Sequence, residues 1–232
     1  MNETKKQARI AGLLYLLASI PAPIAWVYVP SKLIVKDDPT ATADHIRASE
    51  SLLRLGIGSE LIGLILFIFV VLALYRLFKP VNEKHAAAMA ILLLISLPIS
   101  FVGVVNNVAA LIVAGGPKFL STFDQRQLDS LSYLFFRLHD QGILIAQIFW
   151  GLWLFPFGIL VIRSGFIPRF LGYLLFAAAF GYLIGSFTSL LVPAYKQLGG
   201  QVGSILAFCE LPIIFWLLIW GAKPQPSLAE AS

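Results

Sequence analysis

One stretch of the sequence constrains the fold more than any other: from Gly142 to Ile162 there is no formally charged residue. Gln147 is the only strongly polar side chain in this run. A helix of this length can cross the ~30 Å hydrocarbon core of a bilayer. The run ends in a short basic turn, residues 163–169, before the next apolar run begins. The stretch therefore predicts a transmembrane helix followed by a tight turn.

The composition supports the same interpretation. Of the 232 residues, 59% are hydrophobic and 12% are charged, whereas ordinary globular domains carry roughly 25% charged residues. We therefore predict an integral membrane protein with one domain over residues 1–222 and a disordered tail at 223–232. The formal net charge is +5, but the basic residues flank apolar runs, so nucleic acid is not expected as a partner. Cys209 is the single cysteine, which excludes an intramolecular disulfide.

Six apolar runs predict an all-α fold, an integral membrane bundle of six transmembrane helices. The expected spans are residues 10–29, 52–78, 86–114, 142–162, 170–192 and 202–221. Pro21 and Pro23 remove two backbone donors, so the first helix is expected to end or bend near its outer end. Pro98 predicts a kink in the third helix, and Gly115-Gly116-Pro117 predicts its end.

Helical segments are also expected on the outer side of the membrane, before the second and fourth spans. Asp38-Pro39-Thr40 predicts a capped helix start that runs on into the second span. Residues 118–141 carry apolar side chains at roughly helical spacing, with Ser121 and Thr122 as candidate caps. They predict an amphipathic helix that is either separate from the fourth span or continuous with it. Residues 193–201 are expected to form a short outer loop.

Both termini are expected on the cytoplasmic side. The short segments that this places in the cytoplasm carry closely spaced basic residues, such as Lys5 and Arg163. The opposite segments are longer, and they mix basic residues with acidic ones such as Asp44 and Asp129. Dense basic residues on short loops determine the orientation of a membrane protein more strongly than basic residues spread over long loops do. The basic start would also suit a secretory signal, but the apolar run continues to Val29, which favours an uncleaved anchor.

Polar and ionisable side chains gather in the outward-facing half of four predicted spans. Those proposed to line a cavity are Glu60, Asn106, Asn107, His139, Asp140, Gln147 and Glu210. An ionised carboxylate in hydrocarbon costs ~2.5–3.5 kcal/mol on insertion scales, so both glutamates should face the bundle interior or a wet cavity.

Small residues mark two helix faces. The third span carries a stripe of small and polar residues at helical spacing, namely Ser96, Ser100, Gly103 and Asn107. The fifth span carries a pattern that predicts a helix-packing seam, namely Gly181, Gly185 and Ser189.

Each polar residue also has a purely structural interpretation. Glu60 could pair with Arg54 or Arg137 near the interface. The amide side chains could serve only as hydrogen bonds between helices, and His139 could be an interfacial residue. Glu210 has no basic residue within a turn on its own helix, so it is either protonated or paired across the bundle.

Several chemistries do not suit these residues. A zinc site usually takes three or four His, Cys or carboxylate ligands, and His139 is the only histidine among the polar set, so no metal is predicted. His45, His85 and His139 are expected at different depths, which argues against a haem held by two histidines. The sequence has no G-x-S-x-G, P-loop or dinucleotide fingerprint in a usable context, and no cofactor is predicted.

Two segments resemble a known family. SKLIVKDDPTATADHIRASESLLRLG and FWGLWLFPFGILVIRSGFIPRFLG are similar to the two signature regions of the bacterial six-helix membrane family catalogued as domain of unknown function 4386. The resemblance spans essentially the whole chain. It implies six helices and the bacterial cytoplasmic membrane, and it implies no activity and no catalytic residue.

The depth and spacing of the polar residues lead to a functional hypothesis. We expect a multi-pass protein of the cell membrane that binds a small molecule or a lipid in an outward-facing polar cavity, in a transporter-like or receptor-like way. One alternative is a membrane-embedded enzyme that uses Glu210 or Asp140 as acid or base, with His139 as partner. Another is a structural accessory subunit without a ligand. The expected partners are the lipid bilayer and this ligand, and the sequence predicts no oligomeric state.

Overall fold

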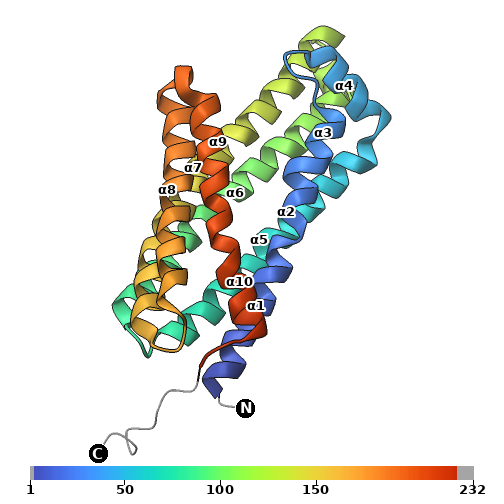
Figure 1. Cartoon of the computed structure of the whole chain (residues 1–232). Coiled ribbons are helices and arrows are strands. Elements are labelled where there is room, and N and C mark those ends of the chain that lie inside the picture. The colour runs from blue at the N-terminus through green and yellow to red at the C-terminus, as the bar shows by residue number, and fades with distance from the viewer. Residues whose placement is uncertain (1–2, 224–232) are drawn as a thin grey trace, which may run out of the picture. The chain divides into compact units, whose positions relative to one another are not determined.

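The computed structural model describes residues 3–223, and all regular secondary structure in that part of the chain is helical (Figure 1). Six helices are long and apolar enough to cross a membrane, which confirms the predicted fold class. Four are single α-helices: α5 (Glu50–Phe78), α6 (Glu83–Ala114), α7 (Gln125–Ser164) and α8 (Arg169–Leu191). The first and last spans, Glu3–Leu33 and Pro193–Ile219, are built from several shorter helices.

The first span continues through its prolines. It consists of α1 (Glu3–Ser19), α2 (Pro21–Pro23), a π-helical turn and α3 (Val29–Leu33). A proline cannot donate its backbone N–H to the preceding turn, and the π-helical turn Ile24–Tyr28 follows directly after the two prolines. Of the two expected alternatives, an end of the helix at these prolines is wrong, because the chain stays helical to Leu33.

The helix before the second span is capped as predicted. In α4 (Pro39–Ala48), the Asp38 carboxylate accepts a hydrogen bond from the Ala41 N–H at 2.9 Å, and proline occupies the first helical position. This helix does not run on into the membrane as expected. Ser49 adopts φ −137° and ψ 47°, which breaks the helix, and α5 begins at the next residue.

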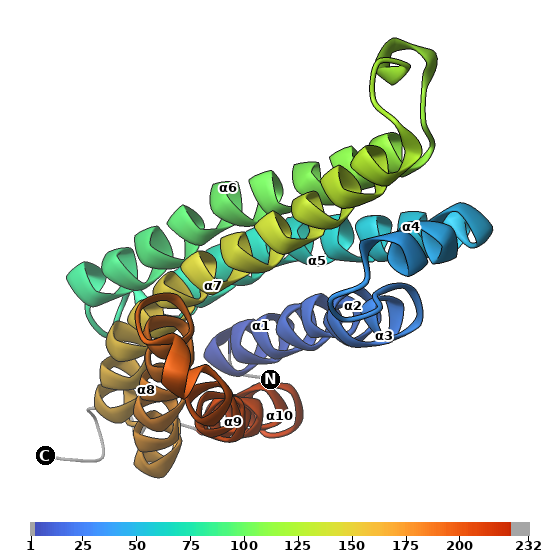
Figure 2. The same ribbon diagram turned by 90° about the horizontal axis from the view of Figure 1, so that it is seen from above.

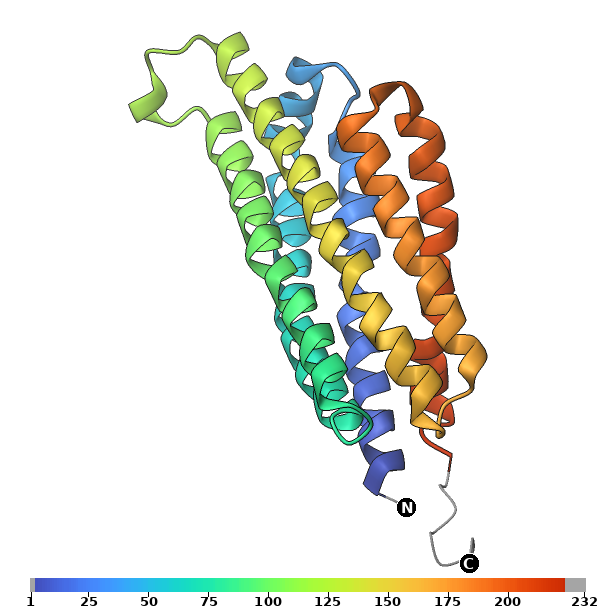
Figure 3. The same cartoon turned by 90° about the vertical axis from the view of Figure 1, so that its left-hand side faces the viewer.

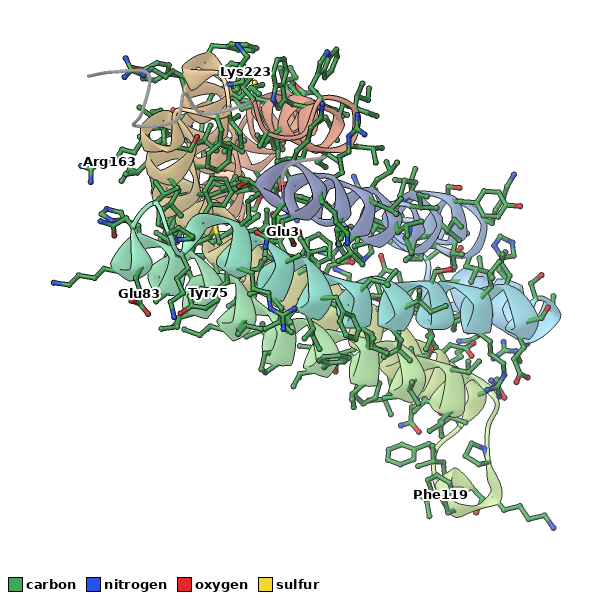
Figure 4. All side chains as sticks on the ribbon, turned by 90° about the horizontal axis from the view of Figure 1, so that it is seen from below. Glu3, Tyr75, Glu83, Phe119, Arg163 and Lys223 are labelled. Carbon is green, nitrogen blue, oxygen red and sulfur yellow. The ribbon has the colours of Figure 1, made fainter. Side chains whose placement is uncertain are left out.

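The fourth span is one helix of 40 residues, α7, so the outer helical segment is continuous with it. The predicted caps, Ser121 and Thr122, are wrong. Asp124 and Gln127 cap the helix reciprocally, each side chain accepting the other residue's backbone N–H at 2.9 Å, which is the capping-box arrangement. The preceding connection holds a short turn, Lys118–Leu120, and projects to one side of the helix ends that it joins (Figure 3). Phe119 lies on this connection and is 76% exposed (Figure 4).

The predicted outer loop at 193–201 is also wrong. A 3₁₀ turn, Pro193–Tyr195, leads directly into α9 (Lys196–Ala207). A second 3₁₀ turn, Phe208–Glu210, then joins α9 to α10 (Leu211–Ile219).

The described residues form two compact units. Unit 1 comprises residues 3–17, 66–97 and 144–223, and unit 2 comprises residues 18–65 and 98–143. One domain over residues 1–222 stays a prediction. The predicted disordered tail lies outside the described residues except for Lys223.

In unit 1, glycines bring α8 close to its neighbours α7 and α9 (Figure 2). A Cβ added at Gly158 would lie 2.9 Å from the carbonyl oxygen of Gly172 across the α7–α8 contact. A Cβ at Gly181 would lie 2.8 Å from the carbonyl oxygen of Gly203, across the α8–α9 contact. The packing seam predicted around Gly181 and Gly185 is therefore confirmed, and its partner surface is the glycine face of α9.

Gly203→Ala should lower the free energy of unfolding by about 1–3 kcal/mol, a typical cost of overpacking. The added Cβ would lie 2.7 Å from the Gly181 carbonyl oxygen and 3.0 Å from the Gly185 Cα, so the two helices must separate. Gly200→Ala is the matched control, because its Cβ would meet nothing within 4 Å and alanine favours a helix over glycine. Denaturant unfolding in detergent micelles compares the two variants, and equal stabilities would contradict this account of the seam.

Unit 2 has its own apolar core, which α3, α4, α5, α6 and α7 all enter. Its buried members are Val29, Leu33, Ile46, Leu53, Ala110, Leu111, Ala114 and Phe136. Ser132 on α7 also donates a hydrogen bond to the Ala110 carbonyl oxygen at 2.9 Å. These contacts hold α5, α6 and α7 together around the polar side chains of this unit.

Candidate functional site

The polar centre of unit 2 is a buried acid–imidazole pair. Glu60 on α5 is 4% exposed and His139 on α7 is 7% exposed. The His139 Nε2 lies 3.1 Å from Oε2 and 3.2 Å from Oε1 of Glu60. The two side chains therefore satisfy each other between two predominantly apolar spans, α5 and α7.

Glu60 lies between two glycines on the face of α5 that packs against the interior of the unit. Gly56 and Gly63 share its helix face at i−4 and i+3. A Cβ at Gly56 would lie 3.1 Å from Val29, and a Cβ at Gly63 would lie 3.5 Å from the Ala18 carbonyl oxygen. The first span thus packs directly against this face of α5.

Glycine also makes room for His139. A Cβ at Gly103 of α6 would lie 3.5 Å from the His139 Cδ2, and a Cβ at Gly142 of α7 would lie 3.8 Å from the Gly103 Cα. On its other side, the His139 Nδ1 lies 3.5 Å from an oxygen of Asp140, whose side chain is half exposed. The imidazole therefore stands between a buried and an exposed carboxylate.

Glu60 does not pair with Arg54 or Arg137, the two arginines suggested from the sequence. Arg54 pairs with Glu50 on the same helix, at 2.6 Å, and both side chains are exposed. Arg137 is exposed as well. The partner of Glu60 is instead the histidine that the sequence placed at the helix mouth, and that histidine is buried.

The two asparagines of α6 behave differently. Asn106 donates its side-chain amide to the Val102 carbonyl oxygen of its own helix at 3.0 Å. Asn107 is 8% exposed, and its Oδ1 has no hydrogen-bond partner among the described residues. Ser96, Ser100, Gly103 and Asn107 are all buried, so the predicted stripe faces the interior. Asn107 lies one turn from Gly103 and offers a free, buried acceptor.

Gln147 and Glu210 belong to unit 1, and both accept a hydrogen bond from α8. The Gln147 Oε1 accepts a hydrogen bond from Ser186 of α8 at 3.5 Å. Glu210 lies in the 3₁₀ turn between α9 and α10 and accepts hydrogen bonds from the hydroxyls of Tyr15 and Tyr182. Glu210 is therefore paired across the helices, by neutral donors rather than by a basic residue.

Two groups of polar residues escaped the sequence reasoning. Tyr15 and Tyr182 were not singled out, because a tyrosine in an apolar run is usual and its partner is distant in sequence. Arg47 and Asp129 form a close ion pair at 2.8 Å in unit 2, although the sequence indicated only that both lie in outer segments. The one feature that could have predicted the pair is opposite charge on two segments that were both expected to be helical and outside the spans.

The described residues, 3–223, contain no group of three His, Cys, Asp or Glu side chains arranged to hold a metal ion. The Glu60 carboxylate and the His139 imidazole support hydrogen bonding, charge pairing and proton exchange. An acid–imidazole pair can serve all three.

Six membrane-spanning helices and buried polar residues within them define a multi-pass helical membrane protein. The chain belongs to the family described as "Domain of unknown function (DUF4386)", whose model matches residues 10–221, and this confirms the resemblance found in the sequence.

One relative comes from an archaeon. An uncharacterized protein of Archaeoglobus fulgidus is 34% identical to the chain over 93 residues, which is 38% of this chain and 54% of the relative. The chain therefore spans about half the length of that relative. No solved structure matches the chain.

Proposed function

We propose that the protein binds a small molecule or a lipid headgroup at the Glu60–His139 site of unit 2. The observation that carries the proposal is the burial of this ionisable pair within the spans. Ionisable residues inside membrane helices are expensive, and they most often mark substrate, ion or ligand pathways.

Two neighbouring groups indicate how a ligand would bind. The Oδ1 of Asn107 is a buried acceptor with no partner among the described residues, so it favours a ligand with a hydroxyl or amine donor. The half-exposed carboxylate of Asp140 lies beside His139 and offers a second acceptor near the surface. The ligand class is therefore a polar molecule or headgroup that carries hydrogen-bond donors.

Native mass spectrometry of the purified protein tests this proposal. The wild type should retain a bound small molecule or lipid, and Asn107→Ala and Glu60→Gln should each reduce its occupancy. Glu50→Gln is the matched control, because Glu50 is an exposed carboxylate on the same helix. Equal occupancy in all four proteins would reject a ligand at this site.

A membrane-embedded acid–base enzyme is the second candidate function. The observation in its favour is the placement of His139 between two carboxylates, at 3.1 Å from Glu60 and 3.5 Å from Asp140. Such an arrangement can hold and orient an imidazole that exchanges protons with a bound substrate. Conversion of the retained ligand by the wild type and not by His139→Gln would favour this candidate over simple binding.

We also propose that both termini face the cytoplasm of a bacterial cell, which places the Glu60–His139 site on the outward side of the cell membrane. The support is the dense basic character of the short connections. In a Cys209→Ser background, Phe119→Cys should react with a membrane-impermeant maleimide in intact cells, and Asn82→Cys only after lysis. The reverse pattern would invert the proposed orientation.

A further inference from the structure

Glu210 is a carboxylate within the last span that lacks a basic partner. Among residues 3–223, the ion pairs involve other carboxylates, those of Asp44, Glu50, Glu60, Glu83, Asp129 and Asp140. The hydroxyls that reach Glu210, from Tyr15 of α1 and Tyr182 of α8, are neutral. They satisfy both carboxylate oxygens as acceptors, yet they do not compensate the charge, and a charge in a poorly solvated site strongly favours a counter-charge.

Aromatic rings surround the two tyrosines. The Tyr15 ring contacts Phe67 edge-to-face at 5.7 Å and Trp153 at 6.1 Å between ring centroids. The Tyr182 ring contacts Trp150 edge-to-face at 6.1 Å. Aromatic faces attract cations through their quadrupole, tryptophan most strongly. The side chains packed around the two tyrosine donors of Glu210 are therefore aromatic, a type of side chain that favours a cation.

The surface beside Glu210 along the chain is apolar. Glu210 itself is half-buried, and its neighbours Phe208 and Leu211 are exposed. A metal ion would need more oxygen, nitrogen or sulfur ligands than one carboxylate and two hydroxyls supply. An organic cation needs only the opposite charge and an apolar contact surface.

We propose that Glu210, with Tyr15 and Tyr182, forms a binding site for a lipophilic monovalent cation, such as an aryl ammonium or phosphonium compound. The carboxylate binds the positive charge, and the aromatic and aliphatic side chains around it contact the apolar body of the ligand. This site lies in unit 1 and does not depend on the Glu60–His139 site.

Tetraphenylphosphonium is a suitable probe, since tetraphenylborate has nearly the same shape and the opposite charge. Equilibrium binding to the purified protein in lipid nanodiscs should show saturable binding of the phosphonium and none of the borate. Glu210→Gln should weaken phosphonium binding by roughly 30-fold or more, the usual loss when one partner of a buried charge contact is removed. Glu83→Gln, an exposed carboxylate of the same unit, is the control and should bind as the wild type does.

A second measurement needs no variant in the site. Cys209 is the single cysteine and directly precedes Glu210, so bound phosphonium should slow its alkylation by N-ethylmaleimide, whereas tetraphenylborate should not. Unchanged affinity in Glu210→Gln, equal binding of both probes, or no protection of Cys209 would each overturn the proposal. Loss of phosphonium binding in Glu60→Gln but not in Glu210→Gln would place the cation at the other centre, and would leave the ligand-retention test of that centre unaffected.

Discussion

Replacing His139 with leucine is expected to lower the free energy of unfolding by about 3–5 kcal/mol, the typical cost of leaving one member of a buried ion pair without its partner. The reason is that Glu60, at 4% exposure, receives its hydrogen bonds from His139 at 3.1 and 3.2 Å. Reversible denaturant unfolding in mild detergent, followed by tryptophan fluorescence, measures the change.

The double variant Glu60→Leu/His139→Leu is the decisive control. Removing both members replaces two buried polar groups with apolar side chains, which is often neutral or stabilising by about 1–4 kcal/mol. We therefore expect the double variant to be markedly more stable than His139→Leu alone. If the double variant lost as much stability as His139→Leu and Glu60→Leu lose together, the two residues would not be energetically coupled.

The same pair of variants separates function from structure. If the pair only holds helices together, a stable double variant should still retain whatever ligand the wild type carries. If the pair binds the ligand, the double variant should fold and lose it. The stability of the double variant and its ligand occupancy are therefore separate measurements, and the occupancy decides between a ligand-binding protein and an accessory subunit.

The spans could be predicted from sequence because the bilayer imposes a length and an apolar composition on every helix that crosses it. Their ends could not always be predicted. Residues 193–201 were expected to form a loop, yet α9 begins at Lys196. Glycine weakens a helix in water, but in this chain Gly199 packs against Thr188 of α8, and the close approach of two membrane helices uses small residues.

The candidate polar residues could be found from their depth, whereas their partners could not. Glu60 and His139 are separated by 79 residues, and hydropathy does not state which helix lies beside which. The choice of Tyr15 and Tyr182 as donors to Glu210 depends on the same lateral packing. Sequence therefore predicted which groups need compensation, and the structure is required to name the groups that supply it.

Replacing Arg47 with methionine is expected to be the second large effect, again about 3–5 kcal/mol, because it leaves a carboxylate buried without its cation. The Asp129 side chain is 2% exposed and that of Arg47 is 31% exposed. The Arg47 Nη1 lies 2.8 Å from Asp129 and also donates to the Ala114 carbonyl oxygen at 3.3 Å. The guanidinium thus joins α4 to the ends of α6 and α7.

The two members of this pair are not equivalent, and their variants should differ. Asp129→Asn leaves Arg47 in contact with Asp44 at 2.6 Å and partly open to solvent, so we expect a loss of only about 1.5–3 kcal/mol, the range for one hydrogen bond to a charged group. Arg54→Met, in an exposed pair with Glu50, is the control and should change stability by less than ~1 kcal/mol. Equal losses for Arg47→Met and Arg54→Met would contradict the assigned role of Asp129.

The pH dependence of the Arg47 contribution follows from the sign of its pKa shift. Its hydrogen bond with Asp129, more than that with Asp44, raises the pKa of Arg47 although partial burial opposes this. A group whose pKa is raised on folding stabilises the folded state below its unfolded pKa and loses that contribution only above its folded pKa. The guanidinium contribution should therefore stay constant from neutral to moderately alkaline pH. Since α4 is held by this residue, hydrogen exchange of residues 39–48 should accelerate in Arg47→Met over that whole range, and acceleration at alkaline pH alone would rule out the guanidinium as the anchor.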